Sequence, residues 1–212
     1  MSVVTYALTT RARLKTFLGI TSTDDNALLD SIIDSVSDFV EHFCDRRFQK
    51  TVYSNQVYDG NDSPYLMLKQ FPVVSGEDFT LQRRDSFDNQ NSWSTIDSEH
   101  FFVKESEGII HYVESFNLEG AIFVKAPQHY RVSYTAGYDF NTAGTKTLES
   151  VGLGDLEFAI WKLCAKVYNQ RKSSGDVQSE SIGDYSVLFR KEAMIDQEIK
   201  GILLSYKREH GN

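Results

Sequence analysis

The chain has 212 residues, of which 41% are hydrophobic and 25% charged, and its formal net charge is −8. This length fits one domain, or one domain with a large insertion. No apolar run approaches the roughly 20 residues that span a bilayer. The N-terminus has no apolar stretch typical of a secretion signal. A protein that grips DNA by its phosphates usually has a basic surplus, so the net charge disfavours tight binding of duplex DNA.

Two helices are predicted near the N-terminus. The first spans residues 11–18, because Thr9 or Thr10 can cap its start and Gly19 can end it. The second spans residues 24–44. Its apolar residues recur with helical spacing on one side: Leu28, Leu29, Ile32, Ile33, Val36, Phe39, Val40 and Phe43. The opposite side carries an acidic stripe: Asp30, Asp34, Asp38, Glu41 and Asp45.

The acidic stripe has several interpretations. Between Lys15 and Arg46 the sequence holds seven acidic residues and no basic one. A face that serves only solubility usually mixes charges of both signs, so a field of one sign favours a partner surface or a repelled polyanion. A divalent cation on Asp30, Asp34 and Asp38 is a weaker hypothesis, because catalytic carboxylates usually converge from different elements around a pocket.

Between residues 48 and 138 the helical period disappears and strand-like segments follow one another. Tyr130, Val132 and Tyr134 alternate with polar neighbours, which is typical of a strand with one buried face. Turn-forming runs such as DGNDSP separate the segments. About six strands are predicted, in TVYSNQVY (51–58), YLMLKQFPV (65–73), HFFVK (100–104), GIIHYV (108–113), AIFVK (121–125) and HYRVSYTAG (129–137).

Helical periodicity returns over residues 155–171. The apolar stripe of this helix is Leu156, Ala159, Ile160, Leu163, Cys164, Val167 and Tyr168. A polar linker, SSGDVQSE, leads into SIGDYSVLF, which fits a short strand or an extended arm. A last helix over residues 191–208 would place these residues on one face: Ile195, Ile199, Ile202, Leu203 and Tyr206.

This order of elements predicts an α+β fold. Residues 1–46 and 151–212 are expected to form a small helical bundle, with the N-terminal helices packed against the helix over residues 155–171. A β-strand-rich insertion over residues 47–150 is expected between the two helical parts.

The sequence carries no recognisable catalytic or cofactor motif. It lacks GxxxxGK[ST], GxGxxG, GxSxG, HExxH and paired CxxC motifs. His42 and Cys44 cannot chelate one metal, since residues two apart on a helix point away from each other, and Cys44 and Cys164 fit small buried hydrophobes better than a disulfide. Trp93 and Trp161 lack basic neighbours suited to a base-stacking platform, although Trp161 can mark a contact between helices. We therefore expect no enzyme activity, no cofactor and no metal.

Two arginine pairs, Arg46–Arg47 and Arg83–Arg84, can contact phosphates. They give an alternative function for the chain, a nucleic-acid-binding module. Salt pairing and capping of a helix end are the commoner roles of such pairs, so this alternative ranks second.

The order of short motifs along the chain is informative. A helix ending in FLGI precedes TSTDDNALLDSIIDSVSDFVEHFCDRRF, and YDG, FPV and GII follow. Then come YTAGYD, a helix ending in YNQR, and SESIGDYSV. Over nearly the whole chain, this order and spacing resembles the head–tail connector proteins of tailed bacteriophages, also called adaptor or head-completion proteins.

The resemblance implies a small helical protein, often with a β insertion, that has no catalytic residues. Such proteins form a ring, commonly of twelve subunits, beneath the portal of a DNA-filled capsid. The ring joins the portal to the stopper or tail, and DNA passes through its axial channel without specific binding. We therefore expect a homo-oligomeric structural protein of the virion neck, made in the host cytoplasm and not bound to a membrane.

The resemblance also implies that the C-terminal part engages the portal. A helix after an extended arm suits docking into a groove of another protein. The expected contact residues are Tyr185, Val187, Phe189, Arg190, Ile195, Ile199, Ile202 and Tyr206. The alternative is that this helix completes the chain's own bundle. The acidic stripe would face either the basic residues of a neighbouring subunit or the DNA path.

Overall fold

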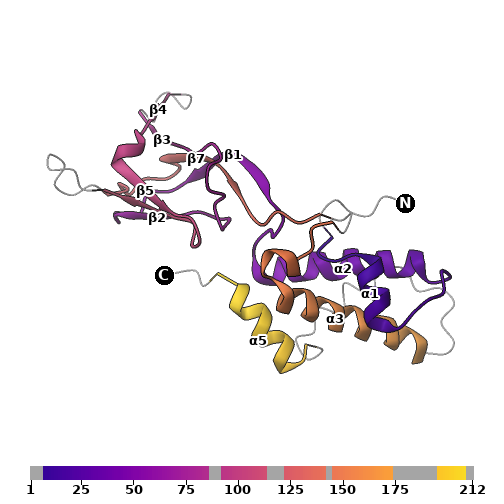
Figure 1. Cartoon of the computed structure of the whole chain (residues 1–212). Helices are drawn as coiled ribbons and strands as arrows, with labels where there is room; N and C mark the ends of the chain where they lie inside the picture. The colour runs from indigo at the N-terminus through magenta and orange to yellow at the C-terminus, as the bar shows by residue number, and fades with distance from the viewer. Residues whose placement is uncertain (1–6, 86–91, 114–121, 142–144, 174–194, 209–212) are drawn as a thin grey trace. The chain divides into compact units, whose positions relative to one another are not determined.

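The computed structural model describes residues 7–85, 92–113, 122–141, 145–173 and 195–208 (Figure 1). Contacts divide the chain into two compact units: residues 1–48 with 139–212, and residues 49–138. The first unit holds the helices and the second holds the strands. The predicted α+β fold, with helices from both ends of the chain and strands between them, is confirmed.

The strand unit, residues 49–138, covers fewer residues than the expected insertion over residues 47–150. Residues 139–150 belong to the helical unit, in which Phe140 and Leu148 are buried. None of the described helices is long and apolar enough to cross a membrane.

The helical unit combines helices from both ends of the chain. They are α1 (Arg11–Leu18), α2 (Asn26–Cys44), α3 (Gly154–Ser173) and α5 (Gln197–Tyr206), with a short 3₁₀ helix, η2 (Glu149–Val151), before α3. α3 packs against α1, α2 and α5, and Figure 1 shows it running beside α2. The expected packing of the N-terminal helices against this third helix is therefore observed.

Local sequence sets the ends of the first two helices. At the start of α1 the Thr10 hydroxyl accepts a hydrogen bond from the backbone N–H of Arg13, and Gly19 ends the helix with a φ of 68°. α2 starts at Asn26 rather than at residue 24 and ends at Cys44, where the cap residue Asp45 has a φ of 51°.

The core of the helical unit follows the apolar periodicity of the sequence. Every residue of the predicted stripe of α3 is buried, and so are Leu29, Ile33 and Val40 of α2. Cys44 and Cys164 are both buried and unbonded to each other, as predicted. Burial raises the pKa of the Cys44 thiol to about 12, so this side chain behaves as a packed hydrophobe rather than a metal ligand.

The strand unit contains two antiparallel sheets. The four-stranded sheet has the order β1 (Thr51–Tyr58), β7 (Tyr130–Ala136), β3 (Thr80–Arg84), β4 (Trp93–Thr95). The three-stranded sheet has the order β2 (Tyr65–Met67), β6 (Ile109–Tyr112), β5 (Phe101–Lys104), with η1 (Ser98–His100) before β5. Both sheets contribute to one core that includes Leu66, Leu81, Ile110, Val132 and Tyr134.

The strand prediction is partly wrong. The segment AIFVK forms no strand among its described residues, and Phe123 makes only an isolated bridge to Ser63. β3 and β4 were not predicted, because paired arginines in β3 and the polar neighbours of Trp93 in β4 hide the apolar alternation. Only the first three residues of YLMLKQFPV form a strand.

Candidate functional site

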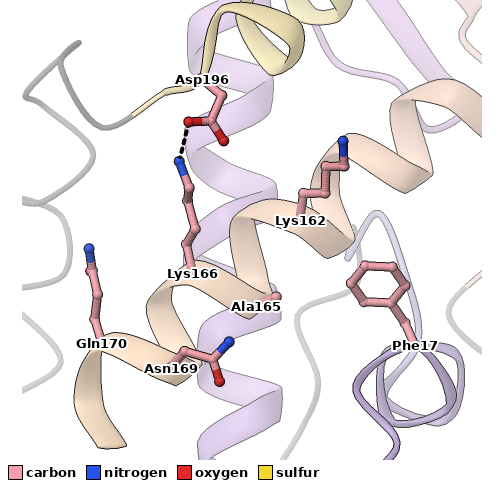
Figure 2. A pocket seen from close by; sticks show the side chains of 7 residues that line it. All are labelled: Phe17, Lys162, Ala165, Lys166, Asn169, Gln170 and Asp196. Atoms are coloured by element: carbon pink, nitrogen blue, oxygen red, sulfur yellow. Dashed lines mark ion pairs between the residues drawn. The ribbon is translucent and has the colours of Figure 1, made fainter. Parts of the chain in front are cut away.

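A groove of about 530 Å³ opens on the surface of the helical unit (Figure 2). Its lining comes from α1, from α3 and from the residue before α5: Phe17, Lys162, Ala165, Lys166, Asn169, Gln170 and Asp196. Two ion pairs join α3 to the start of α5 here, Lys166 Nζ to Asp196 Oδ1 at 2.8 Å and Lys162 Nζ to Glu198 Oε2 at 2.7 Å. The groove is therefore bounded by α1, α3 and the residue before α5, and both lysines on its rim are paired with carboxylates.

Three aromatic side chains lie together beside this groove. The ring centroid of Phe17 is 5.9 Å from that of Phe158 and 5.6 Å from that of Trp161. Phe17 and Phe158 are each 39% exposed. The Lys162 ammonium lies 4.8 Å from the Phe158 ring and the Arg13 guanidinium 5.1 Å from the Trp161 ring. Exposed aromatic rings bordered by cations are typical of protein–protein contacts. The prediction that Trp161 marks a contact between helices is confirmed, because its ring lies on Phe17 of α1.

The buried carboxylate of Glu157 is linked by hydrogen bonds to the residues around this aromatic surface. Glu157 of α3 is 1% exposed, and it accepts hydrogen bonds from Thr9 Oγ1 at 3.0 Å and from Arg13 Nε at 2.8 Å. The Trp161 indole N–H in turn donates to Thr9 Oγ1 at 2.8 Å. The backbone N–H of Glu149 completes the set at 3.3 Å. Glu157 thus anchors the N-terminal segment and η2 to α3.

The residues of the predicted acidic stripe of α2 differ in how exposed they are. Asp30 forms an ion pair with Arg11 at 2.5 Å, and Asp34 is half-buried. Glu41 differs from the expectation because it is only 5% exposed, where it pairs with Arg47 and accepts the backbone N–H of Phe48 at 3.1 Å. Asp38 and Asp45 remain exposed, so they are the carboxylates of the stripe most accessible to a partner.

Glu41 gives a prediction about pH. Burial raises its pKa above the usual 4.5, and the Phe48 N–H and Arg47 oppose this effect. The folded state then binds the proton more tightly than the unfolded state, so the contribution to stability is present at pH values below 4.5 and is lost as pH rises through the raised pKa. Glu41→Gln should remove this pH dependence and change the free energy of unfolding at pH 7 by less than about 1 kcal/mol.

Urea unfolding of both proteins between pH 4 and pH 8 measures this difference. A loss above about 2 kcal/mol at pH 7 would instead mean that the Arg47 pair outweighs the burial of the charge. Glu41→Ala serves as the control, because it leaves the Phe48 N–H without its acceptor and should cost about 1–3 kcal/mol.

The expected docking residues fall into three groups. Tyr185, Val187, Phe189 and Arg190 lie outside the described residues. Ile195 and Ile199 are buried, Ile199 completely, where α5 packs against α2 and α3. Ile202 and Tyr206 are half-buried, and the Tyr206 hydroxyl donates to Asp155 at 2.5 Å. In this structure the apolar face of α5 covers the chain's own bundle.

The two arginine pairs have different surroundings. Arg46 is 4% exposed and its guanidinium lies 4.9 Å from the Phe48 ring, which removes it from a surface that could hold phosphates. Arg84, however, lies 4.9 Å from the Trp93 ring, and Arg131 lies 4.6 Å from the same ring. The expectation that Trp93 and Trp161 lack basic neighbours is therefore wrong, because folding places Arg84 and Arg131 over Trp93 and Arg13 over Trp161.

Comparison with known proteins identifies the family. Residues 7–209 match the head completion protein family. The chain belongs to this family. The predicted resemblance to head-completion proteins is thus confirmed. No curated protein sequence matches this head completion protein.

Solved structures share the fold of this head completion protein. The neck of an empty gene transfer agent particle, computed with C6 symmetry, contains a chain with a TM-score of 0.53 at 12% identity, covering 100% of this chain and 95% of that one. The neck of a native particle, computed with C12 symmetry, gives 0.52 at 13% identity, covering 100% and 94%. The virion of the native particle gives 0.51 at 13% identity, covering 95% and 90%.

The sequence did not indicate two groups of residues that the structure brings together, one around Glu157 and one around Asp97. Nothing near Glu157 indicates a buried carboxylate, since its partner Thr9 is 148 positions away. Asp97, Glu99 and His100 could hold a metal by proximity, with ligand atoms within 4.8 Å of one another, but the two acids are exposed and such groups are common without an ion.

Proposed function

We propose that this head completion protein is a structural component of a virion neck. It forms a homo-oligomeric ring that joins the portal of the capsid to the stopper or tail, and DNA passes through an axial channel in the ring. The observation that carries this proposal is the family match over residues 7–209. The fold shared over the whole chain with chains from necks computed with C6 and C12 symmetry supports it. Twelve subunits is the number that we propose for the ring.

The surface chemistry is consistent with a ring subunit. A ring needs interfaces on both sides of each subunit rather than a catalytic pocket. The exposed aromatic rings of Phe17 and Phe158, beside the ion pairs of Lys162 and Lys166, offer one such interface. Membership of the head completion protein family also favours a structural role without enzyme activity.

The C-terminal region is the proposed portal contact. Fewer of its residues are proposed to touch the portal than the sequence alone suggested. Ile199 is buried within the bundle, so contact through α5 would use its outer side, where Leu204 is 48% exposed and Ile202 and Tyr206 are half-buried. Residues 185–190, which precede α5, complete the proposed contact. DNA would pass without specific binding, because a net charge of −8 opposes attraction to phosphates.

Ring formation provides the test of this proposal. Purified protein should either form rings alone or join a ring when mixed with the portal, because the portal can template assembly. Sedimentation velocity and electron microscopy of the mixture would report the subunit number and symmetry. A chain that stays monomeric at high concentration and also fails to bind the portal would refute the proposed function.

A further inference from the structure

The outer face of the three-stranded sheet carries a row of aromatic side chains. In the sheet register, Tyr65 of β2 and Phe102 of β5 both pair with His111 of β6, which lies between them. The His111 ring stacks on Phe102 with centroids 4.7 Å apart, and it lies 5.9 Å from the Tyr65 ring. Because side chains alternate between the two faces of a strand, Leu66 and Ile110 point to the opposite face, where both are buried in the core. The aromatic row therefore points away from the core.

Apolar side chains extend this row along the same face. Met67 pairs with Ile109 two residues along the strands, and both are half-buried. Val113 follows β6, and its backbone N–H continues the ladder with a hydrogen bond to the carbonyl of His100 at 2.9 Å. We name the whole set the Phe102 face: Tyr65, Met67, Phe102, Ile109, His111 and Val113.

The Phe102 face is strongly exposed for an apolar surface. Tyr65 is 48% exposed and Phe102 52%. Among the described residues ten large hydrophobic side chains are exposed, and three of them, Tyr65, Phe102 and Val113, lie on this one face. Lys104, at the edge of the face, is paired with Glu107. Contiguous exposed apolar side chains that include aromatic rings are typical of protein–protein contacts, so the face offers a partner apolar burial rather than charge.

The charge of the chain favours a second copy as that partner. Each copy has a net charge of −8, so two copies repel each other as they approach. A contact between copies must therefore gain its free energy from apolar burial, which does not depend on the sign of the charges. A basic partner, in contrast, is attracted by the acidic chain as a whole and needs no aromatic row.

The helical unit offers a surface that complements the Phe102 face. A closed ring of identical subunits joined head to tail needs two different surfaces on each copy that fit each other. The groove of about 530 Å³ lies beside the exposed rings of Phe17 and Phe158, and pockets of about 300–1,000 Å³ have room for aromatic groups. Lys162 and Lys166 at this groove are already paired with carboxylates, so it suits an aromatic side chain better than an anion.

We propose that the Phe102 face of one copy packs on Phe17 and Phe158 of the next copy in the ring, with Tyr65 and Phe102 at the groove. This inference rests on the proposed ring and names its subunit contact. Salt screens the repulsion between the acidic copies and leaves apolar burial in place, so wild-type assembly should need less protein as salt concentration rises. Assembly that weakens as salt rises would overturn an apolar contact.

Two variants that keep the net charge test the contact. Tyr65→Thr/Phe102→Thr removes the rings of the sheet and keeps residues that favour strands, and Phe17→Ala/Phe158→Ala removes the rings of the helical unit. Each variant alone should need at least about tenfold more protein to assemble than the wild type, because aromatic anchors carry much of the binding free energy of a contact. An equimolar mixture should form one-to-one pairs that do not grow, because each variant keeps only one of the two surfaces. Native mass spectrometry would show these pairs.

Matched variants separate this contact from general effects. Val52→Thr/Val57→Thr changes two exposed valines of β1, in the other sheet, and should assemble as the wild type does. Circular dichroism melting identifies any variant that fails to fold. Phe17 also packs on Trp161, so Phe158→Ala alone replaces the helical variant if the double variant unfolds.

A disulfide trap measures the same contact without relying on its strength. Phe102→Cys in one preparation and Phe158→Cys in another should form a cross-linked pair when the two are mixed and oxidised with diamide. Cys44 and Cys164 are buried, so the introduced thiols are the ones exposed to the oxidant. Val52→Cys mixed with Phe158→Cys is the control and should give no such pair. Equal cross-linking of Phe102→Cys and Val52→Cys would overturn the assignment of the Phe102 face.

The outcomes distinguish this inference from the proposed function. Rings of wild type and of both variants alike would overturn the contact and leave the neck role intact. Pairs formed by Phe17→Ala/Phe158→Ala alone would mean that two Phe102 faces meet, which overturns the head-to-tail contact. Intact rings of Tyr65→Thr/Phe102→Thr that no longer bind the portal would assign the face to the portal instead. If the wild type forms no ring even with the portal, the neck role fails, and pairing of the two variants still measures the contact.

Discussion

Ile199→Asp is expected to unfold the helical unit. The Ile199 side chain is 0% exposed where α5 packs against α2 and α3. Removing a buried isoleucine side chain costs about 2–5 kcal/mol, and the new carboxylate has no partner there to offset its loss of water. A loss of about 4 kcal/mol or more is a large part of the stability of an ordinary domain.

Fluorescence can follow the two units separately, because Trp161 lies in the helical unit and Trp93 in the strand unit. In a Trp93→Phe background, urea unfolding monitored through Trp161 should show the loss directly. Leu204→Asp on the same helix is the matched control, since Leu204 is 48% exposed and should change stability by less than about 1 kcal/mol. A folded Ile199→Asp protein that no longer binds the portal would show that α5 leaves the bundle to dock.

Glu157→Ala is expected to have the second large effect, a loss of about 1–3 kcal/mol. Removal of this carboxylate deprives the buried Thr9 hydroxyl of its acceptor at 3.0 Å. Arg13 loses its ion pair with Glu157 at 2.8 Å but keeps the one with Glu149 at 2.7 Å. Such a loss exceeds that at the surface because the Thr9 hydroxyl stays away from water without this acceptor. Trp161 stacks near Arg13 and bonds to Thr9, so its fluorescence should change as well.

Glu198→Ala is the control for this second prediction. Glu198 also forms an ion pair, with Lys162 at 2.7 Å, but its side chain is 64% exposed. Exposed pairs contribute about 0–1 kcal/mol because water and salt screen them. Equal losses for the two variants would mean that Glu157 stabilises the bundle no more than a surface carboxylate does.

Both predictions bear on how a head completion protein presents its surfaces. The packing of Ile199 leaves the outer side of α5, with Leu204, for a partner, and the anchor at Glu157 orders the aromatic surface of Phe17 and Trp161. A subunit that must close a ring benefits from surfaces fixed before assembly, because less conformational entropy is then lost on binding.

The helices and the fold class could be predicted from the sequence. The apolar residues of α2 and α3 repeat with the helical period, and burial of one face follows from that pattern alone. Thr10 and Gly19 mark the ends of α1 through local hydrogen bonding and backbone freedom, which involve only neighbouring residues. The order of motifs was enough to indicate the family, which the match over residues 7–209 then showed.

The contact surfaces were decided by the tertiary structure. Glu157 meets Thr9 across 148 positions, and Arg131 reaches Trp93 only because β3 lies between β7 and β4 in the sheet. Glu41 occupies the polar side of the helical pattern, yet the chain folds back at Phe48 and buries it. Sequence periodicity records which face of an element is apolar, whereas partners that are distant along the chain depend on how the elements pack. The sequence by itself therefore determined the helices, the fold class and the family of this protein, and only packing decided which charges are buried and which remain exposed.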